Sequence, residues 1–465
     1  MNEQSRWGVE PRMNAMEALM WRTEADPRLR STGVLFERLD REPDRDWVRA
    51  AHDRATREFW RLRQRVVEDP LGLAAPRWVV DPDFDLDYHL RFVRLPAPGS
   101  LQQVLEHAQI LHQAPFDRQR PLWEAVLVEG VLGDQAAYLL KLHHSLADGQ
   151  GIVQLIEFAH SDRPEPRGRP PLPVPPPGRL TGQALARETA LRAPARGVRG
   201  AVGLGSRVAG AAARAAGQPV GSVRDSVAYV RSLGQVLGPP PTPGSPLLAQ
   251  RSLGRRLGTL DADLAELRGA GKAVGGTVND AFMAAVCGGV GRYHRHHGVD
   301  LDTLTLALPV STRRPEDPPG SNRFAGARIA GPAGIVDPGE RMRLIGERVR
   351  EARAEPALDF LGQLSPGLSR LPGKITGPLS AQLTSSIDVQ CSNIPGLRRE
   401  AYLAGARVTH TYPFGAIPGP AMMATLMSHQ DRCCIGITAD AAAVPDFEVM
   451  LGFLHEGLDE VLALA

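Results

Sequence analysis

The sequence has few cysteines and no long apolar run. Its cysteines are Cys287, Cys391, Cys433 and Cys434, which are irregularly spaced and partly adjacent. This spacing suggests neither a disulfide framework nor a zinc site, so reduced cytosolic thiols are the expected state. No stretch of about 18 apolar residues is present, which argues against a membrane-spanning helix. The opening segment, MNEQSRWGVEPRMNAMEALMW, lacks the apolar core of a secretory signal.

The chain also lacks an excess of charge of either sign. Its formal net charge is +2, so the whole molecule gives no electrostatic reason to expect a nucleic acid as partner. The length of 465 residues, with 43% hydrophobic and 23% charged residues, is typical of a globular protein with two domains. We therefore expect a cytoplasmic protein that is soluble or peripheral to a membrane.

Proline marks the division of the chain. Residues 163–180 contain eight prolines, a density that neither a helix nor a central strand tolerates. A second proline cluster covers 238–246, and the residues between the clusters are rich in Ala, Gly and Arg. We predict an N-terminal subdomain over 1–162, a Pro-rich and helical connector over 163–246, and a C-terminal subdomain over 247–465.

Both halves carry a mixed α/β pattern. The segment GVLGDQ contains the Gly and Asp of a hairpin loop between two apolar runs. Strand-like runs cover 78–93, 123–129, 136–142 and 304–311. Helical patterns cover 45–62, 151–160, 261–271 and a small-residue stretch that begins at Asn279.

The segment HHSLADG, residues 143–149, lies between a strand-like run and a helical one, where a turn aims side chains into a cleft. A metal site would need a third ligand, and no HExxH or HxH pattern accompanies it. A neutral histidine suits general base catalysis, whereas no G-x-S-x-G elbow supports a covalent serine route. A structural interpretation stays open, in which the histidines end the strand and Asp148 caps the next helix.

Several segments resemble one family of enzymes. HHSLADG is similar to the HHxxxDG motif of the coenzyme A-dependent acyltransferase superfamily, which includes chloramphenicol acetyltransferase and condensation domains. The flanking segments resemble the bacterial wax ester synthase/diacylglycerol acyltransferases in order along nearly the whole chain. These segments are DPDFDLDYHLR (81–91), RPLWE (120–124), TVNDAFMAAV (277–286), PVSTR (309–313), GSNRF (320–324), and SNIPG with AYLAGARV (392–408).

The resemblance implies an α/β fold of two chloramphenicol-acetyltransferase-like subdomains, each a mixed sheet with helices, and a tunnel between them. It further implies an acyl-CoA-dependent O-acyltransferase that forms triacylglycerol or wax ester, with diacylglycerol favoured over a long-chain alcohol. Fatty acyl-CoA is the co-substrate, and neither a metal nor a cofactor is implied. Such an enzyme would work at the inner face of the membrane or on lipid droplets. The oligomeric state is not predicted.

The resemblance also implies unequal roles within the motif. His144 is the implied general base and His143 a supporting residue. Asp148 would form a structural ion pair with an arginine, and Gly149 would allow the turn. Sequence alone does not rank the candidate partners of Asp148, which are Arg63, Arg65 and Arg313.

Further segments have both a functional and a structural interpretation. Asn279 and Asp280 are implied to support the acceptor side of the tunnel, but an Asn N-cap with an acid in the first turn also explains them. Ser392 and Asn393 precede Pro395 and Gly396, which form a turn signature, and this turn is implied to line the tunnel, where a hydroxyl or amide helps to stabilise an oxyanion. Residues 121–123 are expected to pack at the start of a strand.

Arg192, Arg196, Arg199, Arg207 and Arg214 recur on one face of a helical connector. Such a stripe suits an anionic lipid surface, although a solvated helix face is the favoured interpretation. Two alternatives to the neutral-lipid enzyme remain open. One is an acyltransferase of specialised metabolism that acylates a polyketide or peptide hydroxyl or amine. The other is a non-catalytic lipid-binding paralogue.

Overall fold

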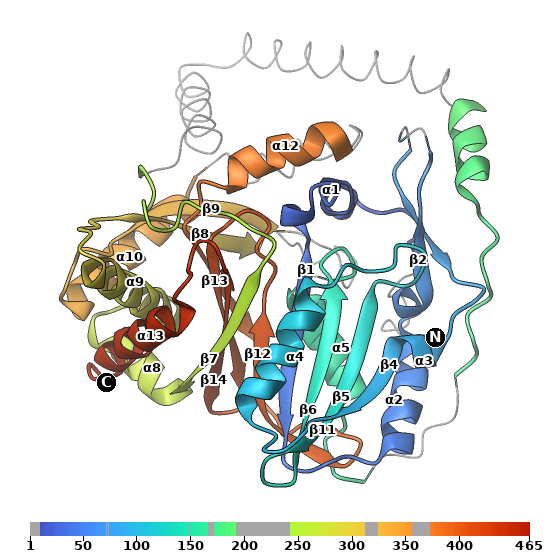
Figure 1. The fold of residues 1–465 in the computed structure, drawn as a ribbon, viewed down its shortest axis with the longest axis horizontal. Helices are drawn as coiled ribbons and strands as arrows, with labels where there is room; N and C mark the ends of the chain where they lie inside the picture. The colour runs from blue at the N-terminus through green and yellow to red at the C-terminus, as the bar shows by residue number, and fades with distance from the viewer. Residues whose placement is uncertain are drawn as a thin grey trace, which may run out of the picture.

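Two six-stranded sheets stand side by side and form the framework of the molecule (Figure 1). The computed structural model describes residues 10–70, 72, 74–147, 149–165, 172–191, 242–311, 324–355 and 373–465. This architecture agrees with the α/β fold of two subdomains that the sequence predicts.

The N-terminal sheet is mixed and mostly antiparallel, with strand order β11-β12-β1-β6-β5-β4. Its strands are β1 (Thr32–Leu39), β4 (Leu90–Arg94), β5 (Trp123–Val131), β6 (Gln135–His143), β11 (Tyr402–Leu403) and β12 (Ala406–Phe414). Only β4 and β5 pair in parallel. A separate two-stranded sheet joins β2 (Gln64–Val67) to β3 (Arg77–Val80).

The C-terminal sheet has strand order β7-β14-β13-β10-β8-β9. Its strands are β7 (Arg255–Asp263), β8 (Leu304–Ser311), β9 (Phe324–Gly331), β10 (Val389–Pro395), β13 (Met422–His429) and β14 (Arg432–Asp440). The strand β10 is parallel to both of its neighbours, β13 and β8, while the other pairs are antiparallel.

One segment of the C-terminal half belongs to the N-terminal sheet. Strand β12 pairs antiparallel with β1, with Val34 opposite Phe414 and Glu37 opposite Thr411. The N-terminal sheet is therefore not made from residues 1–162 alone. The predicted limits of the connector stay a prediction.

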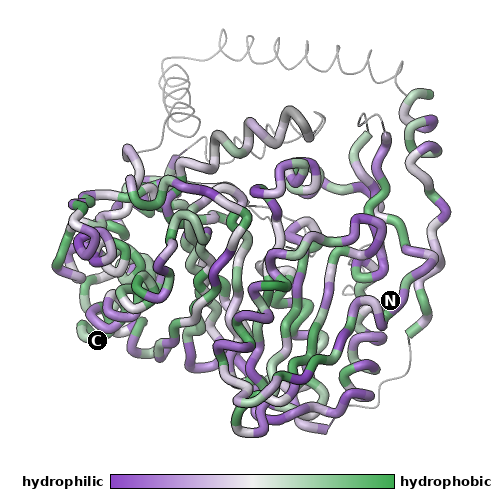
Figure 2. Tube along the Cα trace, viewed as in Figure 1, coloured by the Kyte–Doolittle hydropathy of each residue, from purple (hydrophilic) through white to green (hydrophobic). Residues whose placement is uncertain are grey.

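Helices pack on and around the two sheets, and α4 lies between the N-terminal sheet and β7. They are α1 (Ala15–Thr23), α2 (Arg45–Glu58), α3 (Leu86–His89), α4 (Leu101–Gln113), α5 (Gly149–Ala159), α8 (Leu264–Ala273), α9 (Val278–His296), α10 (Pro338–Arg353), α12 (Gly373–Thr384) and α13 (Phe447–Leu462), with 3-10 turns η2 (Pro27–Leu29) and η3 (Trp60–Arg63). Figure 2 shows hydrophobic residues along the strands and a largely hydrophilic α2. This distribution places the core between sheets and helices.

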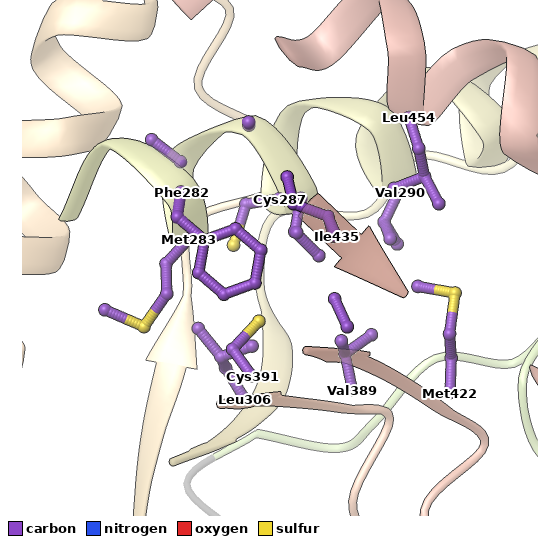
Figure 3. Packing of buried hydrophobic residues seen from close by; sticks show 14 of the residues in the cluster. Phe282, Met283, Cys287, Val290, Leu306, Val389, Cys391, Met422, Ile435 and Leu454 are labelled. Carbon is purple, nitrogen blue, oxygen red and sulfur yellow. The ribbon is translucent and has the colours of Figure 1, made fainter. Parts of the chain in front are cut away.

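The largest core lies between the C-terminal sheet and helices α9 and α13. In Figure 3, Phe282 and Cys287 of α9 project toward strand residues such as Leu306 and Cys391. Small residues along α9 permit this close packing, because a Cβ on Gly289 would come within 2.7 Å of the backbone of Leu454. The small-residue helix that the sequence predicts is thus a central packing element.

Several predicted elements are confirmed, and one is wrong. The hairpin of β5 and β6 turns at Gly133 and Asp134, which both have positive φ, and the predicted strand 304–311 coincides with β8. The prediction of a strand over 78–93 fails in its middle, because the side chain of Asp85 caps a helical turn, α3, between β3 and β4. A short polar cap overrides the alternating pattern there.

The proline-rich linker is extended where the structure describes it. Residues 172–180 contain neither helix nor strand, as the proline density predicts. The linker contacts β3, since the N–H of Gly178 donates to the carbonyl of Val80 over 2.9 Å. Residues 182–191 are helical. The predicted arginine stripe from Arg192 onward lies outside the described residues.

Candidate active site

A cavity lies where the two sheets meet. It holds about 1210 Å³ of empty space, part of which is open to solvent. Its walls come from β1, β6 and β12 of the N-terminal sheet and from β8, β10 and β13 of the C-terminal sheet. Apolar side chains such as Leu35, Leu142, Ile152 and Met423 line most of it. This lining suits a hydrophobic substrate.

His144 lines this cavity directly after the end of β6. Its backbone N–H donates to the carbonyl of Ser31 over 2.7 Å, so the turn is fastened to the residue that precedes β1. The imidazole is half-buried, which leaves it within reach of a bound substrate. The structure therefore places a group capable of proton transfer in the wall of an apolar cavity.

His143 points into the protein interior instead. Its Nε2 lies 2.8 Å from Oε1 of Glu24, and its Nδ1 accepts the backbone N–H of Ser145 over 3.0 Å. Because Nδ1 is an acceptor, Nε2 carries the proton and donates to Glu24. The ring also packs edge-on against Trp21 and Phe116. The adjacent histidines thus have different surroundings, one structural and one open to the cavity.

Glu24 is held as a carboxylate by this arrangement. Burial raises the pKa of Glu24, but the neighbouring His143 and the N–H of Ser31 outweigh burial and lower this pKa below its usual value. The carboxylate connects the end of α1 to the motif, since Glu24 is the C-cap of that helix.

The rest of the motif begins α5. Gly149 lines the cavity, and a Cβ at this position would lie 3.1 Å from Cδ1 of Ile394. Glycine therefore lets the helix start close to β10. Asp148 lies outside the described residues, as does Arg313, so the predicted ion pair stays a prediction. Arg63 has another carboxylate partner, Asp53, at 2.9 Å.

Three of the predicted residues of SNIPG line the cavity, namely Ser392, Asn393 and Pro395. Gly396 does not line it, and lies against the backbone of Ser428. Ser392 and Asn393 belong to strand β10 (Val389–Pro395), which ends at the first residue of the predicted Pro395-Gly396 turn signature. Pairing with β13 extends the segment, and the chain turns only after the proline.

Asn279 and Asp280 are not among the residues that line the cavity. The cap of α9 is Thr277 rather than Asn279. Its hydroxyl accepts the N–H of Asp280, and the Asp280 carboxylate accepts the N–H of Thr277 over 2.9 Å. Asp280 is 4% exposed. The observed contacts of Asp280 are therefore those of a capping box, while the predicted role of Asn279 and Asp280 in substrate binding stays a prediction.

Two polar residues of the cavity wall were missed by the sequence reasoning. Gln390 lies two residues before Ser392 on β10, and Thr425 lies on β13. No local motif signals either residue. By contrast, Leu122 and Trp123 are buried at the start of β5, as the packing interpretation predicts.

Among the described residues, no single helix has the length and apolar composition to span a membrane. Helices α8 and α9 pass that test only together, with a bend of 90° between them.

Comparison with known proteins identifies the family. Residues 13–282 match the model of the wax ester synthase/diacylglycerol acyltransferase catalytic domain, and residues 321–461 match that of the corresponding C-terminal domain. A Mycobacterium tuberculosis protein named putative diacylglycerol O-acyltransferase is 41% identical over 464 residues, covering 98% of this chain and 94% of that protein. A second protein of that name is 32% identical over 428 residues, covering 87% and 86%.

Solved structures show the same fold. The wax ester synthase/diacylglycerol acyltransferase from Marinobacter aquaeolei has a TM-score of 0.65 at 22% identity, covering 97% of this chain and 98% of that one. The first condensation domain of the CDA synthetase has a TM-score of 0.59 at 17% identity, covering 97% and 96%. From the match of both family models, the chain belongs to the wax ester synthase/diacylglycerol acyltransferase family.

Proposed function

We propose that this protein transfers a fatty acyl group from acyl-CoA to the hydroxyl of a hydrophobic alcohol, with diacylglycerol as the favoured acceptor and His144 as the general base. One observation carries the role of His144: of the two adjacent histidines, only His144 lines the cavity, while both ring nitrogens of His143 have partners in the interior. Family membership supports the acyl transfer, and the names of the relatives support the acceptor.

The proposed step uses His144 twice. The imidazole removes the proton of the alcohol, whose oxygen then forms a bond to the thioester carbonyl carbon. The resulting tetrahedral species collapses, the C–S bond breaks, and the imidazolium returns the proton to the coenzyme A thiolate. This direct route needs no covalent enzyme intermediate. Leu35, Leu142 and Ile152 supply the apolar wall for the alkyl portions of both substrates.

Replacement of the base tests the proposal. His144→Ala should lower the rate of coenzyme A release from palmitoyl-CoA by ~10²–10⁴-fold, measured with a thiol-trapping reagent and dioleoylglycerol as acceptor. The exposed His455 offers a matched control, and His455→Ala should leave the rate unchanged. If His144→Ala retained the rate of the unmodified protein, another group would be the base.

A second assay identifies the acceptor. Palmitoyl-CoA is supplied with dioleoylglycerol, hexadecanol or a short alcohol, and the esters are identified by mass spectrometry. Triacylglycerol should be the main product, without any carrier protein present. Ester formation only from a carrier-bound thioester would instead indicate the specialised-metabolism enzyme, and no coenzyme A release with any alcohol would indicate a lipid-binding protein.

A diacylglycerol acceptor resides in a lipid phase. The protein would therefore have to bind the surface of a membrane or lipid droplet to reach it. The predicted stripe of arginines in the connector is one candidate contact. Reversal of the charges at Arg192, Arg196 and Arg199 should weaken co-sedimentation with anionic liposomes if the stripe contributes. Unchanged binding would leave it as a solvated helix face.

A further inference from the structure

The helix that follows the motif is tied down at its far end by a buried histidine and a buried carboxylate. Helix α5 begins at Gly149 and ends at Ala159, and His160 comes directly after it. Nε2 of His160 lies 2.9 Å from Oε2 of Glu37, which stands in the middle of β1. His160 is 6% exposed, and Glu37 is fully buried. The contact therefore joins the end of α5 to a central strand of the N-terminal sheet.

The hydrogen bonds of His160 determine how many protons this pair holds. Nδ1 of His160 lies 2.8 Å from the carbonyl oxygen of Ile156, which can only accept, so Nδ1 carries a proton. Nε2 faces the carboxylate of Glu37, which in its ionised form also only accepts. The contact therefore needs a second proton between Nε2 and Oε2. In its charged form, the pair is an imidazolium beside a carboxylate.

Within the described part of the chain, His160 supplies the one hydrogen bond that Glu37 accepts. Oε1 of Glu37 has no partner there. Tyr138 of β6 is the register partner of Glu37, but its hydroxyl lies 2.7 Å from Nε2 of His52. Nδ1 of that ring donates to the carbonyl of Val48, so its Nε2 accepts the Tyr138 O–H. Loss of the proton on His160 would thus leave the carboxylate without a donor.

The surroundings of the pair are largely apolar. Glu37 lines two cavities with about 520 Å³ and about 250 Å³ of empty space, part of which is open to solvent. Their walls include Leu155 and Ile156 of α5 and Leu397. In such surroundings an ion pair attracts strongly, whereas a buried carboxylate without its partner is costly. The attachment of α5 therefore depends on the proton that the pair shares.

The titratable groups that face the pair differ in their charge at neutral pH. Burial lowers the pKa of His52 on α2 to about 4, and burial also lowers the pKa of His429 on β13. Burial and then Glu37 raise the pKa of Tyr138 on β6. Burial lowers the pKa of His160 too, but the charge and hydrogen bond of Glu37 outweigh it, and the net shift is upward. The three neighbours are therefore uncharged at neutral pH, while His160 carries a proton.

The segments on either side of the pair add a constant charge. Arg399, in the loop after β10, donates from Nη2 to the carbonyl of Glu157 in α5 over 3.1 Å. A guanidinium is not deprotonated in proteins, so Arg399 opposes protonation of the imidazole to the same degree at every pH. Tyr402 of β11 hydrogen-bonds to Glu400, and this bond raises the pKa of Tyr402. Neither segment changes its charge as the pH rises from neutral to mildly alkaline.

Resting on the base proposed above, we infer that Glu37 is a positioning residue for the acyl transfer, which binds protonated His160 and so fixes the helix that follows His144. Helix α5 begins within the motif, and Gly149 and Ile152 of its first turn line the catalytic cavity. A shift of α5 therefore moves both the cavity wall and the turn that carries the base. Glu37 and His160 do not line that cavity, so they act through the helix rather than on the substrates.

This arrangement predicts a loss of activity on the alkaline side. Below the unperturbed histidine pKa of about 6.5, the contribution of the pair to stability is fully present. As the pH rises through the raised pKa of His160 in the folded protein, the shared proton leaves and this contribution is lost. A general base must be neutral, so protonation of His144 affects the acid side of the profile instead. A fall in kcat on the alkaline side therefore reports on the pair.

Two substitutions of Glu37 separate the charge from the contact. In Glu37→Gln, the amide donates to the neutral Nε2 of His160, and this contact needs no shared proton. Its kcat at pH 7 should stay within about threefold of the unmodified protein, and the alkaline fall should disappear. Glu37→Leu leaves His160 without a partner, and kcat should fall by about 10²-fold with little change in KM.

A second histidine–carboxylate pair provides a matched control. Nε2 of His297 lies 2.9 Å from Oδ2 of Asp446, the same separation as in the pair of Glu37 and His160. This second pair is partly exposed and joins the end of α9 to the start of α13 in the C-terminal half. His297→Gln should therefore leave both kcat and its pH profile unchanged.

The experiment measures kcat and KM with palmitoyl-CoA and dioleoylglycerol from pH 6.5 to pH 9, and hydrogen–deuterium exchange at pH 7. In Glu37→Leu, exchange should become faster in residues 149–160 and not in α13. An alkaline fall that is absent from the unmodified protein, or that persists in Glu37→Gln, would overturn the inference. So would a kcat of Glu37→Leu within about twofold of the unmodified protein, or a lower kcat without faster exchange in 149–160.

If Glu37→Leu does not fold, the pH profile of Glu37→Gln decides the matter by itself. Failure of the proposed function has a separate signature. In that case the unmodified protein releases no coenzyme A with any alcohol, while the exchange measurement still shows whether the pair holds α5. A failure of the inference alone leaves the unmodified protein active and sensitive to His144→Ala.

Discussion

Nε2 of His143 lies 2.8 Å from Oε1 of Glu24, and the same carboxylate oxygen accepts the N–H of Ser31 over 2.7 Å. The carbonyl of Ser31 in turn accepts the N–H of His144. One partly buried carboxylate thus fixes both the histidine that supports the motif and, through Ser31, the backbone of the residue that would act as base. The position of His144 depends on contacts of residues that do not themselves line the cavity.

The first prediction follows from this chain of contacts. Glu24→Ala leaves the Nε2–H of His143 and the N–H of Ser31 without their acceptor, which should cost about 1–3 kcal/mol of stability. The turn that carries His144 should also shift, and we expect kcat to fall by about 10²-fold with little change in KM. Glu24→Gln keeps an acceptor oxygen and should retain more activity. Equal loss in both variants would show that the charge matters rather than the contacts.

The second prediction concerns acid stability. Burial lowers the pKa values of His52, His89 and His112 to about 4 in the folded protein. Below about pH 6.5 the unfolded chain binds protons at these sites that the folded chain does not. The unfolding free energy should therefore fall as the pH drops from about 6.5 to about 4, by up to ~1.4 kcal/mol per unit for each histidine.

Urea unfolding at several pH values between 7 and 5 measures this dependence. His89 Nδ1 contacts the carbonyl of Trp123 over 2.7 Å, and Asn retains a donor near that position. His89→Asn should therefore reduce the slope, whereas replacement of the exposed His455 should not. A slope unaltered by His89→Asn would contradict the assignment.

The third prediction concerns the junction of the sheets. The hydroxyl of Tyr412 on β12 lies 2.9 Å from both carboxylate oxygens of Asp261 on β7. Burial and the nearby Asp261 raise the pKa of Tyr412. Tyr412→Phe should lower the unfolding free energy by about 1 kcal/mol, since solvent at the exposed Asp261 weakens the contact.

Tyr402 is a suitable comparison for the same measurement. Its hydroxyl bonds to Glu400, only two residues away, and joins no two sheets. Tyr402→Phe should therefore change the urea midpoint less than Tyr412→Phe. The reverse order would show that the contact between β12 and β7 adds little to stability.

The fourth prediction concerns the thiols. All the cysteines are free and buried, and burial raises the pKa of Cys287 and Cys434 to about 12 and of Cys433 to about 11. Native protein should therefore react slowly with iodoacetamide at pH 8, while protein in urea reacts fully. Rapid labelling of the native protein, followed by mass spectrometry, would identify a thiol exposed by local opening.

The sequence located the elements whose signals are local. The two apolar runs on either side of Gly133 and Asp134 predicted the hairpin of β5 and β6, whose second strand ends within the motif, at His143. The cap of α9 was misassigned although its signal is present, because Thr277 stands three residues before Asp280 in the spacing of a capping box.

Long-range pairing explains what the sequence did not predict. The partner of β1 on one side is β12, whose residues lie more than 350 positions further along the chain. Likewise, Ser392 and Asn393 stand directly before the turn signature of Pro395 and Gly396, but pairing with β13 makes them part of a strand. Thr425 stands in an apolar strand, and only the packed fold shows which face of that strand meets the cavity.

Strand β12, a C-terminal segment that pairs within the N-terminal sheet, limits how far the two halves can move apart. Gly436 of β14 allows β12 and β14 to pack very closely, since a Cβ on Gly436 would lie 2.2 Å from the carbonyl oxygen of Pro413 in β12. Strand β12 is thus hydrogen-bonded into the N-terminal sheet and also packs against β14 of the C-terminal sheet. A movement that separates the two halves would have to part β12 either from β1 or from β14, so this strand opposes a clamshell opening.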